Sequence, residues 1–464
     1  MTNQEPVRDA RTLGVPKMLL LGLQHMFAMF GATVLVPILV NNYGLPLSIQ
    51  TTLFFAGIGT LFFHVCTRLK VPAFLGSSFA FLGGFEAVSK LDSGKYAAME
   101  ASEKLQYACG GIVVAGLLYV ILAGVIKLVG VKKVMRFLPP VVTGPIIILI
   151  GLNLAPSAVN NAKTCWWLAL VAMAIIIVAN IWGKGMIKII PILLGVVGSY
   201  VIAVVANAMG AQAWDFSGAE PVKVALMNFT SVAQSSPIGL QPFFTDFGGS
   251  IAKFDLTSIL VMAPIAIAAM MEHIGDMSAI SATVGEDFLS DPGLHRTLIG
   301  DGIATSLSAL FGGPANTTYG ENTGVLVLSK VYDPKVIRLA AIYALVLSFS
   351  PMFAAVVNSM PAAIVGGVSF ILYGMISAIG VRNVVENRVD FTNSRNLIIA
   401  AVILVCGLGF SGGLTFEVGG ASITLTALAI AALAGIILNA ILPGKDYEFG
   451  SDVTDGRSAD FGRY

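Results

Sequence analysis

The chain has 464 residues, of which 56% are hydrophobic and only 11% are charged, and its formal net charge at pH 7 is +1. Soluble domains carry about 25% charged residues, so this composition excludes an ordinary soluble protein. A near-neutral chain without a basic stripe of interleaved aromatic residues also gives no indication of nucleic-acid binding.

Apolar runs recur along the chain at the length that a membrane-spanning helix needs. About 20 apolar residues cross roughly 30 Å of hydrocarbon as a helix, and a helix satisfies its own backbone polar groups in lipid. We therefore predict an all-α, multi-pass membrane protein of the cytoplasmic (inner or plasma) membrane. Residues 1–17 are polar and are expected to form a cytoplasmic tail.

Fourteen spans are predicted, seven in each half of the chain. The first half, residues 18–207, has spans at 18–40, 46–67, 71–90, 106–130, 134–155, 164–182 and 187–207. A polar extracytoplasmic loop, residues 208–256, precedes the second half. That half, residues 257–442, has spans at 257–280, 296–312, 314–330, 335–357, 361–380, 394–410 and 421–442. Residues 443–464 are expected to form a second cytoplasmic tail.

The distribution of positive charge agrees with this topology. If both termini are cytoplasmic, 21 of the 27 lysines and arginines fall on the cytoplasmic side. Cytoplasmic loops are enriched in these residues, and an error of one span would scramble the bias. The pattern therefore favours fourteen spans with both termini inside.

Seven spans per half place the two halves in opposite orientations, and faint sequence traces favour such an inverted repeat. Three pairs of motifs occur in the same order in both halves: Gln24-His25 with Glu272-His273, Pro72-Ala73 with Pro314-Ala315, and Pro139 with Pro361. Inverted repeats are typical of transporters, in which the substrate site lies near the bilayer midplane.

The third and tenth spans open with segments that are unusually rich in glycine and small polar residues, 72–81 and 314–324. We predict that each is a short extended stretch followed by a half-helix, which a membrane tolerates only where protein or a cavity surrounds it. The N-termini of half-helices offer free N–H groups and the positive end of the helix dipole. Two short tilted helices with polar mouths are the alternative.

Four carboxylates lie inside apolar spans, where an ionisable group is costly and indicates function. Glu272 and Asp276 are four residues apart and share one helical face, while Asp301 and Glu321 lie in the next two spans. We interpret Glu272 and Glu321 as functional residues. Asp276 and Asp301 are either functional or hydrogen-bonded to a neighbouring helix.

The first span carries Gln24 and His25, which can bond across helices. His25 is either a packing residue or part of a substrate site. The Glu272-His273 pair is not an HExxH motif, and no third metal ligand lies at a useful spacing. The four cysteines also lack metal-site spacing, so we expect neither a metal nor a metal hydrolase.

Five segments closely resemble the nucleobase–ascorbate (nucleobase:cation symporter-2) transporter family, and in particular its bacterial uracil permeases: 24–31, 76–81, 272–275, 291–296 and 316–322. The resemblance runs from about residue 20 to residue 442. It implies a core domain of spans 1–4 and 8–11, a gate domain of spans 5–7 and 12–14, proton-coupled uptake of a nucleobase, and a homodimer. Protons would be the coupling ion, and no other cofactor is implied.

The family motifs also imply roles for particular residues. Glu272 and Glu321 would bind the base, and the backbone N–H groups of Phe79 and Gly320 would donate to it. The resemblance adds further substrate-binding candidates, namely Tyr319, Tyr373, Gln24 and Ser78. We expect a proton to bind Glu272 or Asp276 and to relieve the repulsion within the carboxylate cluster, with His25 and Asp301 as further proton-coupling candidates.

Uracil suits such a site, because its flat ring offers N–H donors to carboxylates and C=O acceptors to half-helix N–H groups. One departure concerns Asp276, which stands where uracil permeases often have histidine and which is reminiscent of xanthine and purine members. A xanthine or purine–proton symporter is therefore the alternative. An anion transporter of the same fold is disfavoured by the carboxylates, and an enzyme lacks a nucleophile–base pair.

Overall fold

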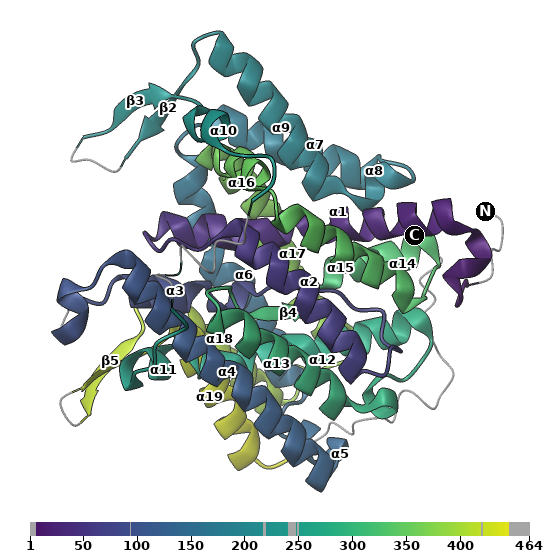
Figure 1. Ribbon diagram of the computed structural model, residues 1–464. Coiled ribbons are helices and arrows are strands. Elements are labelled where there is room, and N and C mark those ends of the chain that lie inside the picture. Colours follow the sequence, from purple (N-terminus) through teal and green to yellow (C-terminus); the bar gives the residue numbers. More distant parts are fainter. Residues whose placement is uncertain are drawn as a thin grey trace.

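The computed structural model describes residues 6–92, 94–216, 220–239, 247, 250–418 and 421–444, and these form a mostly helical molecule (Figure 1). Within this part of the chain, seven helical segments are long and apolar enough to cross a membrane: Val15–Asn42, Ile49–Cys66, Ala101–Val129, Pro140–Ala162, Pro191–Ala208, Leu256–Val284 and Ala362–Glu386. Shorter apolar helices accompany them. A multi-pass membrane protein is thereby supported.

The first half begins with η1 (Ala10–Leu13), α1 (Val15–Asn42) and α2 (Ile49–Cys66). A strand, β1 (Leu75–Ser77), then leads into η2 (Phe79–Phe81) and the short α3 (Leu82–Ser89). The remaining helices are η3 (Gly94–Ala98), α4 (Ala101–Val129), α5 (Val131–Met135), α6 (Pro140–Ala162), α7 (Trp166–Ile181), α8 (Met186–Ile189) and α9 (Pro191–Ala208).

The second half starts with α11 (Leu256–Met262) and α12 (Ile265–Val284), which break at Pro264 because proline has no N–H for the helical ladder. The π-helical η5 (Leu289–Gly293) and α13 (Leu294–Leu310) precede a second strand, β4 (Asn316–Thr318), and α14 (Gly320–Ser329). The chain ends with α15 (Pro334–Ser348), α16 (Pro351–Asn358), α17 (Ala362–Glu386), α18 (Ser394–Gly409) and α19 (Ala427–Ile441).

Several predicted boundaries differ from the structure. The predicted span 134–155 is wrong at both ends, because Pro139 and Pro140 start α6, which continues to Ala162. The predicted span 335–357 bends by 88° between α15 and α16. The predicted span 421–442 is helical only from Ala427, since 421–425 is strand β6, paired with β5 (Leu414–Val418).

The loop between the halves contains structure that the sequence analysis did not predict. Strands β2 (Gln212–Asp215) and β3 (Val222–Ala225) form an antiparallel hairpin, and α10 (Thr230–Gln234) follows. Figure 1 shows this hairpin projecting beside α9. Most of the tail at 443–464 lies outside the described residues.

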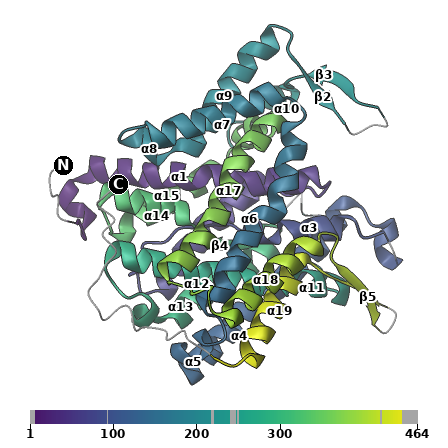
Figure 2. The same cartoon turned by 180° about the vertical axis from the view of Figure 1, so that it is seen from behind.

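Helix packing follows a pattern that recurs in the two halves. Helix α6 packs along α17, α4 along α13 and α2 along α15, while α7 packs on α9 as α18 packs on α19. Small residues permit close backbone approach, since a Cβ on Gly116 of α4 would lie 2.5 Å from the carbonyl oxygen of Gly302 on α13. In Figure 2, α6 and α17 run side by side across the molecule.

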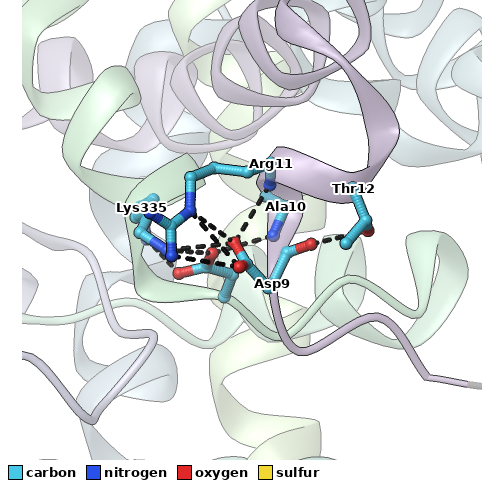
Figure 3. A network of polar contacts seen from close by, with 6 residues as sticks. Asp9, Ala10, Arg11, Thr12 and Lys335 are labelled. Carbon is cyan, nitrogen blue, oxygen red and sulfur yellow. Dashed lines mark hydrogen bonds and ion pairs between the residues drawn. The ribbon is translucent and has the colours of Figure 1, made fainter.

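Residues 7–13, which we call the N-terminal strap, tie several elements together (Figure 3). Val7 forms a parallel bridge with Val331, just beyond α14. The N–H of Ala10 donates to Asp333 at 2.8 Å, and Lys335 reaches Asp9 at 3.1 Å. Arg8 forms an ion pair with Glu286, beyond the end of α12. The strap therefore joins the ends of α12 and α14 to the start of α15.

Candidate functional site

The two short strands meet at the centre of the molecule and form an antiparallel ladder, with Leu75 opposite Thr318, Gly76 opposite Thr317 and Ser77 opposite Asn316. Each strand leads directly into a half-helix, η2 and α3 after β1, and α14 after β4. The predicted extended stretches in spans 3 and 10 are confirmed. The alternative of two tilted helices is wrong.

The ladder has a local two-fold symmetry with an offset of 241 residues. The N–H of Ser78 donates to the carbonyl of Ala315 at 2.8 Å, and the N–H of Tyr319 donates to the carbonyl of Phe74 at 3.0 Å. The equivalent of Ala73 is then Pro314, so the predicted match of Pro72 with Pro314 is displaced by one residue.

Neighbouring helices support the strands in the same symmetric way. The hydroxyl of Thr60 on α2 accepts from the N–H of Leu75 and donates to its carbonyl. The hydroxyl of Thr305 on α13 makes the same two bonds to Asn316, the equivalent residue in β4. Each strand is therefore held on its outer side by one threonine, which satisfies backbone groups that the short ladder leaves unpaired.

Both half-helices begin without a side-chain cap. Ser78 precedes η2 and Tyr319 precedes α14, and neither side chain bonds to the first turn. The first N–H groups of a helix have no partner within the helix and carry the positive end of its dipole. The N–H groups of Phe79 and Gly320 therefore lie at the crossing point in the first turns of the two half-helices, and their role as donors to a base stays a prediction.

The four carboxylates predicted from the sequence lie around the start of α14. Asp276 accepts a hydrogen bond from Thr318 at 3.0 Å, and its Oδ1 atom lies 3.6 Å from where a Cβ on Gly320 would be. Both Glu321 and Asp301 lie within electrostatic range of Glu272. The structure thus brings together carboxylates from α12, α13 and α14.

A buried polar chain links two of these carboxylates. His273 Nδ1 lies 3.0 Å from Asp301 Oδ2, and both side chains are fully buried. The Thr318 hydroxyl lies 3.5 Å from the same nitrogen and bonds to Asp276 on its other side. Asp301, His273, Thr318 and Asp276 therefore lie in a row, each within 3.5 Å of the next.

Several buried polar atoms at the crossing have no hydrogen-bond partner among the described residues. These are Glu272 Oε2, Ser78 Oγ, Thr317 Oγ1, Thr323 Oγ1 and Tyr373 OH. A buried polar atom without a partner costs about 1–3 kcal/mol. Unpartnered buried polar atoms beside carboxylates are typical of a binding site, where a ligand supplies the missing bonds.

Two aromatic side chains meet at this point. The rings of Phe79 and Tyr373 lie edge to face, with centroids 6.0 Å apart and an interplanar angle of 74°. The Tyr319 side chain does not join this pair of rings. A Cβ on Gly76 would lie 2.4 Å from its ring, and its hydroxyl donates to the carbonyl of Ser77 at 2.9 Å. Tyr319 therefore packs the ladder.

The first helix contributes two of the predicted residues. His25 is fully buried, and the side-chain amide of Asn322 on α14 donates to its carbonyl at 3.0 Å and lies 3.3 Å from its Nδ1 atom. Gln24 is also buried. His25 therefore joins α1 to the half-helix that carries Glu321.

Sequence reasoning missed His273 and Thr318 as members of the site. His273 entered the sequence analysis through a repeat motif, a family segment and a rejected zinc motif, but not as a site residue, and Thr318 was one of several small polar residues before α14. Their closeness in sequence to the predicted carboxylates could have indicated them, because Thr318 lies three residues before Glu321 and His273 is adjacent to Glu272. In the described part of the chain, no group of three or more histidines, cysteines or acidic residues is arranged to hold a metal.

Comparison with known proteins identifies the family. The family model described as the Permease family matches residues 16–415. The chain belongs to this permease family. It is the nucleobase:cation symporter-2 family whose motifs the sequence resembles.

Two relatives are similar over nearly their whole lengths. The chain is 40% identical to the uracil permease of Bacillus caldolyticus, covering 95% of this chain and 94% of the relative. It is 39% identical to the uracil permease of Bacillus subtilis (strain 168), covering 91% of each. These relatives are permeases, which confirms the prediction of a transporter rather than an enzyme.

A solved structure shows the same fold. The transmembrane domain of the cyanobacterial bicarbonate transporter BicA superposes with a TM-score of 0.61 at 15% identity, over 94% of this chain and 99% of that chain. At this identity the likeness concerns the fold alone.

Proposed function

We propose that this permease carries uracil into the cell together with protons, by alternating access. The observation that carries the proposal is the pair of carboxylates, Glu272 and Glu321, beside two uncapped half-helix N-termini. The names of the relatives, uracil permeases at 39–40% identity, support the substrate.

Recognition of the base follows from complementary hydrogen bonding. The carboxylates of Glu272 and Glu321 accept from the ring N–H groups of uracil, while the N–H groups of Phe79 and Gly320 donate to its carbonyls. Phe79 and Tyr373 cover the ring face, and the Ser78 hydroxyl adds a further polar contact. Gln24 and Tyr319 support the site from α1 and from the ladder.

Proton coupling arises because carboxylates that share one buried site repel each other. A proton on Glu272 or Asp276 relieves this repulsion and admits a neutral base. The row of polar groups from Thr318 through His273 to Asp301 extends the set of groups that share the proton. His25 contributes by holding α14 through its contacts with Asn322. One proton moving through 100 mV supplies about 2.3 kcal/mol, enough for roughly 50-fold accumulation.

We further propose fourteen spans in a 7+7 inverted repeat, with both termini cytoplasmic, a core domain and a gate domain. The symmetric ladder and the recurring helix pairs support the repeat. The core domain holds the half-helices, and the gate domain includes α6 and α17, which face them. A homodimer of such chains in the lipid bilayer completes the proposal.

The test is uptake of labelled uracil into proteoliposomes, with and without an acid-outside pH gradient, in competition with excess unlabelled xanthine. Gradient-driven uracil uptake that xanthine leaves unchanged supports the proposal. Suppression by xanthine, or no uracil uptake, would show that Asp276 and Asp301 indicate a purine substrate. Sulfate or bicarbonate flux without any base would instead identify an anion transporter.

A further inference from the structure

A cavity of about 120 Å³ that shares no residue with the proposed nucleobase site lies among residues of the α5–α6 connection, the α17–α18 connection and α19. In Figure 2, α5 and α19 lie at the lower end of the molecule, away from hairpin β2–β3. Three arginines line the cavity: Arg136, Arg388 and Arg395.

Hydrogen bonds to Asn439 hold the Arg395 guanidinium in place. This guanidinium donates to the side-chain oxygen of Asn439 at 2.6 Å and to the carbonyl oxygen of Asn439 at 3.0 Å. Asn439 in turn donates from its amide to the carbonyl of Arg136 at 3.0 Å. One polar network therefore connects α19, the start of α18 and the segment before α6, and it builds the wall of the cavity.

Arg136 and Arg388 are different, because neither guanidinium has a side-chain partner among the described residues. Asp390 is the acidic residue of the lining, and it is already engaged by the N–H and hydroxyl of Thr392 at 2.8 and 2.7 Å. These bonds hold the pKa of Asp390 below its ordinary value, so the carboxylate stays charged. Three guanidinium groups against one occupied carboxylate leave the cavity positive.

Exposed apolar side chains adjoin the positive residues along the chain. Phe137 follows Arg136 and is 47% exposed, Leu397 follows Arg395 by two residues and is 54% exposed, and Ile441 lies near the end of α19 and is 72% exposed. A soluble anion makes no contact with such exposed apolar side chains, whereas a molecule with a phosphate group and acyl chains can contact them as well as the arginines.

We propose that this cavity binds the phosphate group of an anionic membrane phospholipid, with Arg136 and Arg388 as the phosphate ligands and Arg395 as the fixed wall. Arginine presents a planar fork of donors that matches phosphate oxygens. Basic pockets between the cytoplasmic ends of transmembrane helices suit lipid headgroups. The lipid bridges the connections on both sides of the α6–α17 pair. The free phosphate ion shares the headgroup chemistry, and the experiment separates the two.

The experiment measures binding of phosphatidylglycerol to the full-length protein in mild detergent by native mass spectrometry. Arg136→Gln and Arg388→Gln each weaken binding about fivefold, and the double variant about 25-fold, because each basic residue near an anionic headgroup contributes about that factor. The matched control is Arg382→Gln, which removes the same charge from α17 one turn before Glu386 but does not line the cavity. Thermal melting of each variant checks that the protein is folded.

Loss of lipid in the double variant with retention in Arg382→Gln supports the proposal. Equal binding of phosphatidylglycerol by the double variant and the unmodified protein overturns it. A parallel titration with inorganic phosphate, followed by phosphorus NMR, tests the second source. Binding of phosphate that depends on Arg136 and Arg388, without retention of lipid, would overturn the lipid assignment.

Discussion

Thr318 lies at the junction between strand β4 and helix α12. Its hydroxyl donates to Asp276 at 3.0 Å and lies 3.5 Å from His273 Nδ1, while its backbone belongs to the ladder. One residue therefore fixes both the strand that forms the crossing and the carboxylate beside it.

Thr318→Val removes this hydroxyl while keeping the shape of the side chain. We expect uracil uptake to fall about tenfold, and its pH profile to move, because Asp276 loses its donor in a buried position. The measurement is initial uptake rate against external pH in proteoliposomes. Thr318→Ser keeps the hydroxyl and should transport normally, whereas an unchanged profile in the valine variant would contradict the role.

Glu272 supplies a carboxylate with one oxygen that has no partner among the described residues. We expect Glu272→Gln to abolish gradient-driven uracil uptake. A glutamine amide cannot carry the proton, and it has one acceptor oxygen where the carboxylate has two. Uptake in the presence and absence of the pH gradient is the measurement. The control is Glu86→Gln, since Glu86 is partly exposed and paired with Lys90. Substantial coupled transport by Glu272→Gln would remove this residue from the proton pathway.

At the scale of elements, the crossing strands depend on close approach of a side chain to a backbone. A Cβ at position 76 would lie 2.4 Å from the ring of Tyr319. Gly76→Ala should therefore destabilise the protein by about 1–3 kcal/mol, as overpacking does elsewhere. Thermal melting in detergent measures this loss. Gly83→Ala in α3 meets no atom within 4 Å and should leave the melting temperature unchanged or slightly higher.

The N-terminal strap is the second element with a testable property. Hydrogen bonds from Arg11 and Lys335 hold the pKa of Asp9 well below its ordinary value of 3.8. A depressed pKa means that the stabilisation is fully present above the ordinary value and is lost as the pH falls below it. We expect hydrogen-exchange protection of residues 7–13, corrected for intrinsic rate, to be constant from pH 7 to about 5 and to decline below about pH 4.

Asp9→Asn provides the matched variant at neutral pH. It should lower the protection of the strap already at pH 7, whereas Asp92→Asn, in an exposed loop elsewhere, should not. Protection that is independent of both pH and the Asp9 side chain would show that the backbone bridge between Val7 and Val331 suffices alone.

At the scale of the whole molecule, the proposed orientation predicts which segments a membrane-impermeant thiol reagent reaches. Ser231→Cys lies in exposed α10 within the predicted outer loop, and Lys184→Cys lies in the exposed connection between α7 and α8. We expect labelling of the first variant, but not of the second, in intact cells. The unmodified chain gives the background from the four native cysteines. The reverse pattern would invert the topology.

Much of the architecture was predictable because lipid imposes a simple rule on sequence. Helix positions followed from apolar length, and the unusual third and tenth spans followed from the run of small polar residues before Phe79 and Gly320. Their exact ends were not predictable. Proline pairs such as Pro139 and Pro140 start a helix at a place that hydropathy does not mark, and residues 421–425 pair as a strand despite an apolar composition.

The site was predictable to the extent that charge inside an apolar span is conspicuous. Glu272, Asp276, Asp301 and Glu321 could be found by this criterion, and the structure gathers them around one point. The partners that orient them could not, because the pairing of His273 with Asp301 and of Thr318 with Asp276 joins residues from different helices. Such contacts depend on tertiary packing, for which a single sequence carries no periodic signal.

The ladder between β1 and β4 has a consequence for biosynthesis. Its two strands are separated by 241 residues between Gly76 and Thr317, so β1 leaves the ribosome long before its partner exists. At 5–20 residues per second, this interval is roughly 10–50 s. During that time the N–H and carbonyl groups of residues 75–77 lack their ladder partners in a nascent chain that is already entering the membrane. The first half therefore enters the bilayer before the ladder can form. A chain that stops before Asn316 lacks β4 and cannot form the ladder at all.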